Sequence, residues 1–440
     1  MMDLVERVRQ AGVVGAGGGG FPTHVKLSGK ADTVIANGAE CEPLLHKDAA
    51  CMEHEAPAVV AGVRHAMEAV GAAAGVVAVK AKNAGAVEAV RAAIAGTPVQ
   101  LALLGDYYPA GDEYDLVHEV TGRLIPPAGI PLDVGVVVAN VETLANVAAA
   151  VEGRPVTQKL LTVAGAVRTP ATVRVPVGTS LREAIALAGG ATVEDPALAV
   201  GGLMMGTTIF DLDAPVTKTT GGVIVLPRSH PVIRRKLTGD DGMRKIGKAA
   251  CDQCRYCTEL CPRYLLGYAV EPHQVMRGLG FTATGTAHWS TLAQLCCACG
   301  LCTLYACPEA LFPKEACDDA KVELRRLGMK PDTAREVRVH PMRSGRRVPI
   351  RSLMRRLAVT EYAHPAPLLE AQAAPRRVLL PLRQGAGVAN QPTVRAGERV
   401  RAGQALGGIP DGALGAIIHA PFDAIVAAVG DGAVALERAE

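Results

Sequence analysis

Two blocks of cysteines near the middle of the chain constrain its fold more than any other feature. Both read C-x2-C-x2-C followed by a further cysteine and a proline, over residues 251–262 and 296–308. Three thiolates at this spacing on one loop can hold three corners of a cubane cluster. The cysteine before the proline leads into a helix and points toward a second cluster. The blocks therefore predict two [4Fe-4S] clusters with crossed ligand sets: Cys251, Cys254, Cys257 and Cys307 for one, and Cys296, Cys299, Cys302 and Cys261 for the other.

Zinc and disulfide bonds are the alternatives for these cysteines. Zinc sites mostly use two C-x2-C pairs or include histidine, and neither block has a histidine among its cysteines. Disulfides would require an exported chain. The second block departs from the bacterial cluster pattern, because four residues rather than three separate Cys302 from Cys307. Cys297 stands beside Cys296, but only Cys296 has the x2 spacing to Cys299, so we expect Cys297 to be a packed thiol.

The length and composition of the chain indicate its number of domains, its partners and its cellular location. At 440 residues the chain should hold about three or four domains, and with only 3% aromatic residues its cores must be built from small side chains. The net charge of +3 favours neither nucleic acid nor an acidic membrane surface. The first residues lack an apolar run of signal-peptide length, and nothing downstream reaches about 18 consecutive apolar residues. We therefore expect a cytosolic protein with no transmembrane segment and no nucleic-acid partner.

A second informative region lies at the N-terminus, where glycines crowd residues 15–20 ahead of Lys26. Glycine has no Cβ, so backbone N–H groups can approach a phosphate closely, and a lysine adds a positive charge. A flexible turn is the alternative for such a segment alone. Here two apolar strands, within 34–43 and 134–144, run into polar residues. Ligands of open α/β sheets collect at the carboxyl ends of strands, so the region predicts an α/β domain that binds a phosphate-bearing ligand. Among the scattered histidines, only His24 is expected to neighbour a cofactor.

Three motifs in this region carry a family resemblance. They are G-A-G-G-G-G-F-P-T-H-V-K (15–26), N-G-A-E-C-E-P (37–43) and N-V-E-T-L (140–144). Together they resemble the FMN and NADH site of the 51 kDa subunit of respiratory complex I and, more closely, the C subunit of the Rnf electron-transport complex. The chain departs from the complex I pattern at Ala39, where that pattern has an aspartate. The resemblance implies that Glu42 lies near the nicotinamide nucleotide as a catalytic residue and that FMN is cradled by Gly15, Gly17, Gly18, Gly20, Lys26, Asn37, Glu40, Asn140 and Thr143.

The expected architecture is multidomain, α/β and β. Residues 1–152 form the FMN- and NADH-binding α/β domain, and residues 153–230 resemble the SLBB-type β-grasp domain that follows it in the same families. Residues 231–330 form a helical, ferredoxin-like domain with two [4Fe-4S] clusters, and residues 331–440 form a basic connector and a barrel-sandwich hybrid domain. Twelve Lys or Arg against three acidic residues over 321–356 indicate a solvated surface connector, with a docking patch for an acidic partner as the alternative.

The order of these regions separates two relatives. The Rnf subunit begins with its barrel-sandwich segment, whereas here that segment is C-terminal. This order and the run C-D-Q-C-R-Y-C-T-E-L-C-P-R-Y (251–264) resemble the cobalamin reductases of propanediol-utilization microcompartments. The resemblance implies NADH-dependent reduction of cob(III)alamin to cob(II)alamin, and on to cob(I)alamin, for reactivation of the diol dehydratase cofactor. It also implies NADH and a corrinoid as reactants, an adenosyltransferase and shell proteins as partners, and a cytoplasmic location inside a bacterial microcompartment.

Electron chemistry agrees with this interpretation. NADH delivers two electrons at once as a hydride, an iron–sulfur cluster accepts one, and a flavin can take the pair and release electrons singly. The sequence shows no Ser-His-Asp, paired-carboxylate or metal-hydrolase pattern that would compete. The alternative function is that of a non-catalytic electron-transfer subunit in an Rnf-like NADH:ferredoxin oxidoreductase complex.

Overall fold

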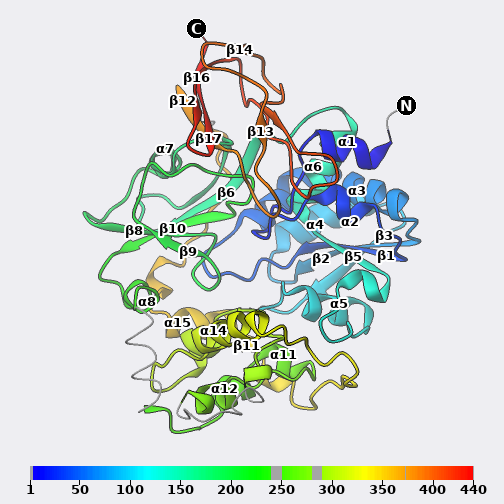
Figure 1. Ribbon diagram of the computed structural model, residues 1–440, viewed down its shortest axis with the longest axis vertical. Coiled ribbons are helices and arrows are strands. Elements are labelled where there is room, and N and C mark those ends of the chain that lie inside the picture. Colours follow the sequence, from blue (N-terminus) through cyan, green and yellow to red (C-terminus); the bar gives the residue numbers. More distant parts are fainter. Residues whose placement is uncertain (1–2, 239–249, 280–289, 372, 440) are drawn as a thin grey trace.

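The computed structural model describes residues 3–238, 250–279, 290–371 and 373–439. Four groups of elements follow one another along the chain, and we name them by their residues: the N-terminal domain (4–151), the β-grasp domain (158–236), the cysteine domain (250–326) and the barrel domain (377–438). Figure 1 shows the N-terminal domain at the right, the β-grasp domain at the left, the cysteine domain at the bottom and the barrel domain at the top. No helix among the described residues is long and apolar enough to cross a membrane.

The N-terminal domain is a parallel sheet of strand order β3-β2-β1-β5 with helices packed on it. Its strands are short apolar runs, as expected for strands buried on both faces. Asn37 pairs in register with Asn140, so two polar side chains lie together at the carboxyl edge of the sheet. The elements are α1 (Leu4–Gln10), α2 (Thr23–Leu27), β1 (Thr33–Gly38), α3 (Lys47–Val70), β2 (Ala74–Lys80), α4 (Ala84–Ile94), β3 (Val99–Leu104), β4 (Tyr107–Tyr108), α5 (Glu113–Thr121), η1 (Pro131–Val134), β5 (Val136–Asn140) and α6 (Val141–Val151).

The β-grasp domain is a mixed sheet of strand order β7-β6-β10-β8-β9. Its main helix begins where the sequence places a hydroxyl cap, because the Ser180 and Glu183 side chains bond each other's backbone N–H in a capping box. The elements are β6 (Gln158–Gly165), β7 (Ala171–Pro176), α7 (Leu181–Leu187), β8 (Pro196–Val200), β9 (Thr207–Ile209), β10 (Gly222–Pro227) and α8 (Pro231–Lys236).

The cysteine domain consists of short helices around the two cysteine loops. As predicted, a helix starts directly at the proline that follows Cys261. The same expectation is wrong after Cys307, because Ala310 has a φ of 53°, which interrupts helical geometry, and the next helix begins only at Pro313. The elements are α10 (Tyr256–Glu259), α11 (Pro262–Leu265), α12 (Pro272–Gly278), η2 (Cys302–Ala306) and α14 (Pro313–Arg326).

Much of the basic connector is exposed, as expected, but that expectation is wrong for two of its arginines, which are partly buried in ion pairs. The side chain of Arg343 is only 11% exposed and its guanidinium lies 2.6 Å from Asp115 on α5. Arg347 pairs with Glu119 of the same helix. These two positive charges are therefore neutralised by acids of α5. The elements here are η3 (Ser344–Arg346), β11 (Val348–Pro349), which pairs with β4, α15 (Ile350–Arg356) and η4 (Thr360–Tyr362).

The barrel domain packs against both of the first two domains. Its loops reach the glycine-rich segment, where the Ala386 N–H donates to the Gly20 carbonyl at 3.0 Å. Lys218 of the β-grasp domain donates to the carbonyls of Gly12 and Ile417, at 2.8 and 2.7 Å, and so contacts all three domains at one point. The elements are β12 (Arg377–Pro381), β13 (Gln391–Pro392), β14 (Arg399–Val400), β15 (Gly407–Gly408), β16 (Ala424–Gly430) and β17 (Ala433–Arg438).

Candidate functional site

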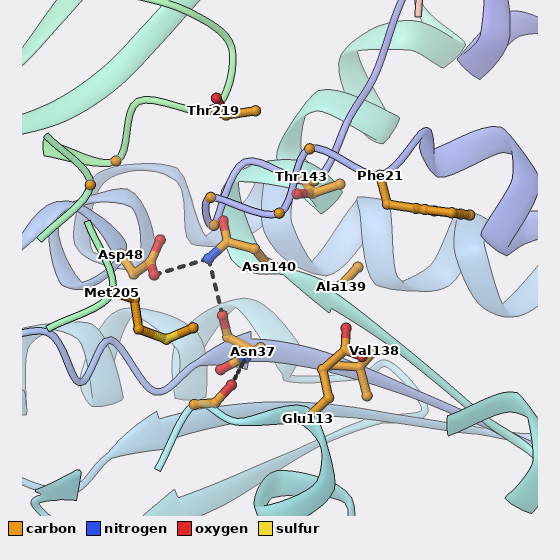
Figure 2. A pocket seen from close by; sticks show the side chains of 18 of the residues that line it. Phe21, Asn37, Asp48, Glu113, Val138, Ala139, Asn140, Thr143, Met205 and Thr219 are labelled. Carbon is orange, nitrogen blue, oxygen red and sulfur yellow. Dashed lines mark hydrogen bonds between the residues drawn. The ribbon is translucent and has the colours of Figure 1, made fainter. Parts of the chain in front are cut away.

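A cavity of about 1130 Å³ lies between the N-terminal and β-grasp domains. One wall is formed by the glycine-rich loop and the carboxyl ends of β1 and β5, and the facing wall by residues 200–209 and 215–221. Figure 2 shows this cavity, with Thr219 and Met205 of the β-grasp domain across from the asparagines of the sheet. All the residues predicted to hold FMN or nicotinamide line it: Gly15, Gly17, Gly18, Gly20, Lys26, Asn37, Glu40, Glu42, Asn140 and Thr143.

The glycine-rich loop forms a cradle for an anion. Gly18 has a φ of 110° and Gly20 a φ of 60°, conformations that residues with side chains rarely adopt. Nothing lies within 4 Å of a Cβ built on Gly18 or Gly19, so the backbone there faces open space. The Thr143 Oγ1 accepts the Ala16 N–H at 2.8 Å and holds the loop against α6. The phosphate of FMN fits such a loop, because backbone N–H groups can reach it.

Most of the short helix α2 borders this cavity. Thr23, Val25, Lys26 and Leu27 line it. The ammonium of Lys26 donates to Glu113 at 2.9 Å and to the Val138 carbonyl at 3.0 Å, which fixes its position at the wall. His24 is not part of that lining and instead borders, with Val25, a separate cavity of about 420 Å³. The structure therefore does not place His24 in the cavity expected to hold the cofactor.

The two asparagines at the sheet edge are held by hydrogen bonds (Figure 2). The amide of Asn37 donates to the Gly111 carbonyl at 3.0 Å. The amide of Asn140 donates to Asp48 at 2.9 Å, while its oxygen accepts the Glu142 N–H at 3.0 Å and caps α6. Each side chain is thereby held in a single orientation at the carboxyl edge of the sheet.

A buried network of charges, which sequence reasoning missed, lies beneath these asparagines. Lys47 bonds Asp48 at 2.5 Å and Glu142 at 3.1 Å, and Glu142 also pairs with Lys159 of the β-grasp domain. Burial alone would raise the pKa of Glu142, but Lys159 and then Lys47 outweigh it and hold that pKa below its ordinary value. Glu142 belongs to the N-V-E-T-L motif, which is the one signal in the sequence that could have found this network.

Glu40 is an acid of the cavity whose pKa is raised by its surroundings. Its carboxyl accepts the Asp48 N–H at 3.0 Å. Burial, and then the charge of Asp48, raise the pKa of Glu40 to about 8. Ala39, where the chain departs from the complex I pattern, is fully buried, and its N–H donates to the Asn37 side chain at 3.1 Å. At this position the chain therefore has a buried methyl group and a backbone contact with Asn37.

Glu42 joins the cavity to the β-grasp domain. Its two carboxylate oxygens accept the N–H groups of Met204 and Met205 at 2.8 and 2.7 Å. Burial raises the pKa of Glu42, although these bonds oppose that effect. The catalytic role of Glu42 at a nicotinamide stays a prediction, whereas its contact with the Met204 loop is observed.

The two cysteine loops share one backbone pattern. Two residues after the first cysteine of each loop, Gln253 and Ala298 have φ values of 60° and 55°. Four residues after it, Arg255 and Gly300 have φ values of 70° and 78°. Such values are uncommon outside glycine, so their repetition indicates that both loops wrap in the same way. The shared pattern aligns Cys296, not Cys297, with Cys251.

The predicted cysteine sets come together in space. Three hydrogen bonds point at their sulfurs, from Gln253 to Cys251 at 3.2 Å and from the N–H groups of Ala298 to Cys296 and Leu311 to Cys307, both at 3.3 Å. Such bonds stabilise the thiolates of an iron–sulfur cluster, so the residues present fit this group. Burial raises the pKa of the Cys302 thiol, and its neighbours Cys296 and Cys261 raise it further. The first set lines one small cavity: Cys251, Cys254, Cys257 and Cys307.

Cys297 is more than a packed thiol. It lines the large cavity together with Cys299 and shares a thiol hydrogen bond with it. Among the described residues, no three His, Cys, Asp or Glu side chains converge on a point that would hold a single metal ion. A cubane needs a different arrangement, with one thiolate at each of four corners.

Comparison with known proteins places this geometry in a family context. Four family models match in order: the Nuo51 FMN-binding domain over residues 8–149, the SLBB domain over 160–208, the 4Fe-4S dicluster domain over 250–312 and the RnfC barrel sandwich hybrid domain over 360–439. These matches confirm the predicted fold class, the C-terminal position of the barrel-sandwich segment, and FMN and two [4Fe-4S] clusters as cofactors.

Similar proteins cover different shares of the chain. The C subunit of the Na(+)-translocating ferredoxin:NAD(+) oxidoreductase complex of Acetobacterium woodii is 36% identical over 60% of this chain and 58% of its own length. A crystal structure of the air-oxidized NAD+-reducing [NiFe]-hydrogenase superposes with a TM-score of 0.50 at 22% identity, over 82% of this chain and 66% of that one, which supports the fold alone.

Two relatives match over almost their whole length. The cobalamin reductase PduS of Salmonella typhimurium is 44% identical over 99% of this chain and 96% of the relative. The protein of the same name from Citrobacter freundii is 43% identical over 98% and 96%. The chain therefore belongs to the PduS cobalamin reductase family.

Proposed function

We propose that this protein is an NADH-dependent reductase that passes electrons through FMN and two [4Fe-4S] clusters to oxidised cobalamin. The observation that carries the proposal is the composition of the large cavity. The glycine-rich loop and Cys299 border the same space, so a flavin held by the loop would occupy a cavity that a predicted cluster ligand also lines. Full-length membership of the PduS family supports cobalamin as the acceptor.

Different residues of the cavity would contact different parts of FMN. FMN, when bound, supplies the chemistry that takes a hydride pair from NADH and releases electrons singly. The N–H groups of the glycine-rich loop and the Lys26 ammonium would hold its phosphate, and the asparagines would orient its ring. Glu40 is neutral below its raised pKa and so adds no negative charge beside the anionic cofactor. The β-grasp wall excludes water from the opposite side.

We assign the FMN site to the residues that line the cavity from the N-terminal domain: Gly15, Gly17, Gly18, Gly20, Lys26, Asn37, Glu40, Asn140 and Thr143, with Glu42 toward the nicotinamide. We assign the clusters to two ligand sets. They are Cys251, Cys254, Cys257 and Cys307, and Cys261, Cys296, Cys299 and Cys302.

The cellular location and the protein partners are also part of the proposal. We infer that the protein works in the cytoplasm inside a bacterial microcompartment, beside shell proteins and an adenosyltransferase that converts the reduced corrinoid. The reduction of cob(III)alamin, and on to cob(I)alamin, would then reactivate the diol dehydratase cofactor. Recovery of the protein in purified microcompartments, and its absence from the soluble fraction, is the expected result.

The function is tested by anaerobic reconstitution with iron, sulfide and FMN, followed by NADH. Added hydroxocobalamin should lose its oxidised spectrum with turnover. Ferredoxin serves as the competing acceptor. Fast transfer to ferredoxin with no reduction of cobalamin would move the assignment to an electron-transfer subunit of an Rnf-like complex.

A further inference from the structure

The two cysteine sets stand at different distances from the large cavity. We call Cys261, Cys296, Cys299 and Cys302 the inner set, and Cys251, Cys254, Cys257 and Cys307 the outer set. Of these cysteines, Cys299 lines the large cavity, with its neighbour Cys297. The outer set lines a small cavity built wholly from residues 251–313, with no residue of the N-terminal or β-grasp domain. Within the outer set, Cys254 is exposed to solvent.

Tyr108 connects the large cavity to the inner set. Its side chain lines the cavity, is 2% exposed, and donates a hydrogen bond from its hydroxyl to the Cys299 carbonyl at 2.6 Å. Strand β4 carries it, and pairing of Tyr108 with Val348 of β11 holds that strand in place. A buried phenol keeps its hydrogen-bond partner, so this bond fixes the cysteine loop relative to the cavity.

Two further contacts hold the inner loops against the cavity. Arg263, two residues after Cys261, pairs with Asp112 at 2.9 Å, and its side chain is only 9% exposed. Gly300 has a φ of 78°, and a Cβ built there would lie 3.2 Å from the Met204 carbonyl of the β-grasp domain. The inner set is therefore packed against both walls of the cavity, whereas the small cavity that the outer set lines is formed by the cysteine domain alone.

We propose that electrons pass from the cavity to the inner set, then to the outer set, and leave the protein beside Cys254. Tyr108 is a positioning residue for the first of these transfers. The inference rests on the proposed function for its donor and acceptor. Electron tunnelling slows steeply with distance, so the set that borders the cavity receives electrons first. The electrons balance: one NADH becomes NAD+ and gives two electrons and one proton, two cob(III)alamin each take one electron, and the proton goes to water.

Two cysteine variants test the order. Cys254→Ser leaves the inner set complete, and Cys299→Ser leaves the outer set complete. Each protein is mixed with NADH, frozen at set times and examined by electron paramagnetic resonance for a reduced cluster. In Cys254→Ser the remaining cluster should be reduced at the wild-type rate. In Cys299→Ser it should be reduced about 100-fold more slowly or not at all, although dithionite reduces it fully. Equal rates in the two variants, or the reverse order, would overturn the proposal.

The role of Tyr108 is tested with every cluster ligand in place. Tyr108→Phe should leave flavin bleaching by NADH unchanged and slow the appearance of the reduced cluster by about tenfold. Tyr114→Phe is the matched control, because the Tyr114 hydroxyl donates to the Gly129 carbonyl at 2.6 Å but does not line the large cavity. Wild-type cluster reduction in Tyr108→Phe, or equal slowing in Tyr114→Phe, contradicts a positioning role.

The proposed function can fail separately from this order. If wild-type protein shows flavin and cluster reduction by NADH but no cobalamin reduction, the acceptor is wrong and the order is still measured in the cysteine variants. If NADH does not bleach the flavin, the proposed function fails. Stepwise reduction with a chemically reduced flavin, followed by the same resonance measurements, then decides the order.

Discussion

Loss of Glu142 should destabilise the fold, because Glu142 neutralises two buried lysines at the cavity. We predict that Glu142→Ala lowers the free energy of unfolding by about 3–5 kcal/mol, the cost of leaving buried charges without a partner. Glu152→Ala is the control, since Glu152 pairs with Arg154 on the surface at 63% exposure and should contribute about 0–1 kcal/mol. Denaturant unfolding measures both, and similar losses in the two variants would show that the buried network stabilises nothing.

Glu40 should make stability depend on pH. Burial and Asp48 raise its pKa from 4.5 to about 8, so the folded state keeps a proton that the unfolded state has lost. Stability should therefore fall as pH rises through the window from about 4.5 to about 8. Glu40→Gln keeps a neutral acceptor for the Asp48 N–H. Its melting temperature should therefore increase relative to that of the wild type as pH rises from about 5 to about 8. A difference in melting temperature that does not change with pH contradicts the raised pKa.

For single residues, the sequence predicted which side chains line the cavity but not the buried network of charges beneath them. Asn37, Asn140 and the glycines follow from motifs that share an edge of the sheet. Lys47 and Lys159 could not be predicted, because they meet Glu142 across 95 and 17 residues of chain and from two domains. In sequence they are ordinary lysines, which are usually exposed.

Among the elements, the glycine-rich loop has the strictest requirement for residues without a side chain. Gly18→Val forces a branched residue into a φ of 110° and fills the open space where a phosphate would lie. We predict an affinity for FMN about tenfold weaker or more, equivalent to roughly 1.4 kcal/mol, with iron content unchanged. Gly71→Val is the control: Gly71 has a φ of 74° and equally open surroundings, but it lies at the end of α3 and does not line the cavity. Fluorescence titration measures both, and full flavin binding by Gly18→Val would remove the assignment of this loop.

The cysteine loops show what spacing can and cannot predict for an element. The C-x2-C-x2-C pattern correctly implied two equivalent loops, since both repeat the same left-handed positions. The pattern did not predict the turn at Ala310, which delays the start of the next helix. Alanine rarely adopts a positive φ, so the residue type gives no sign of this turn.

On the scale of the whole molecule, Lys218 is the point at which three domains meet. Lys218→Met leaves the buried carbonyls of Gly12 and Ile417 without a donor, at about 1–3 kcal/mol each. We predict that the barrel domain is then released more readily, seen as faster limited proteolysis ahead of residue 377. Lys236→Met is the control, because Lys236 donates to the Gly206 carbonyl within the β-grasp region. Equal proteolysis of the two variants would show that the Lys218 contact does not hold the domains together.

The sequence predicted the kinds of domain and their order, but not how they dock. Domain type follows from motifs and local periodicity, whereas docking depends on charges that look solvated in sequence. Arg343 was expected at a solvated surface and instead pairs with Asp115, and Lys218 shows no pattern that would place it in a buried junction. Only the folded chain brings these partners together.

The most direct measurement of the central claim is the stoichiometry of electron transfer. Reconstituted protein is supplied anaerobically with a limiting amount of NADH and an excess of hydroxocobalamin, and both are followed by absorbance. The account predicts about two cob(II)alamin formed per NADH oxidised, because a hydride pair is divided into single electrons. NADH oxidation with no cob(II)alamin formed would contradict it.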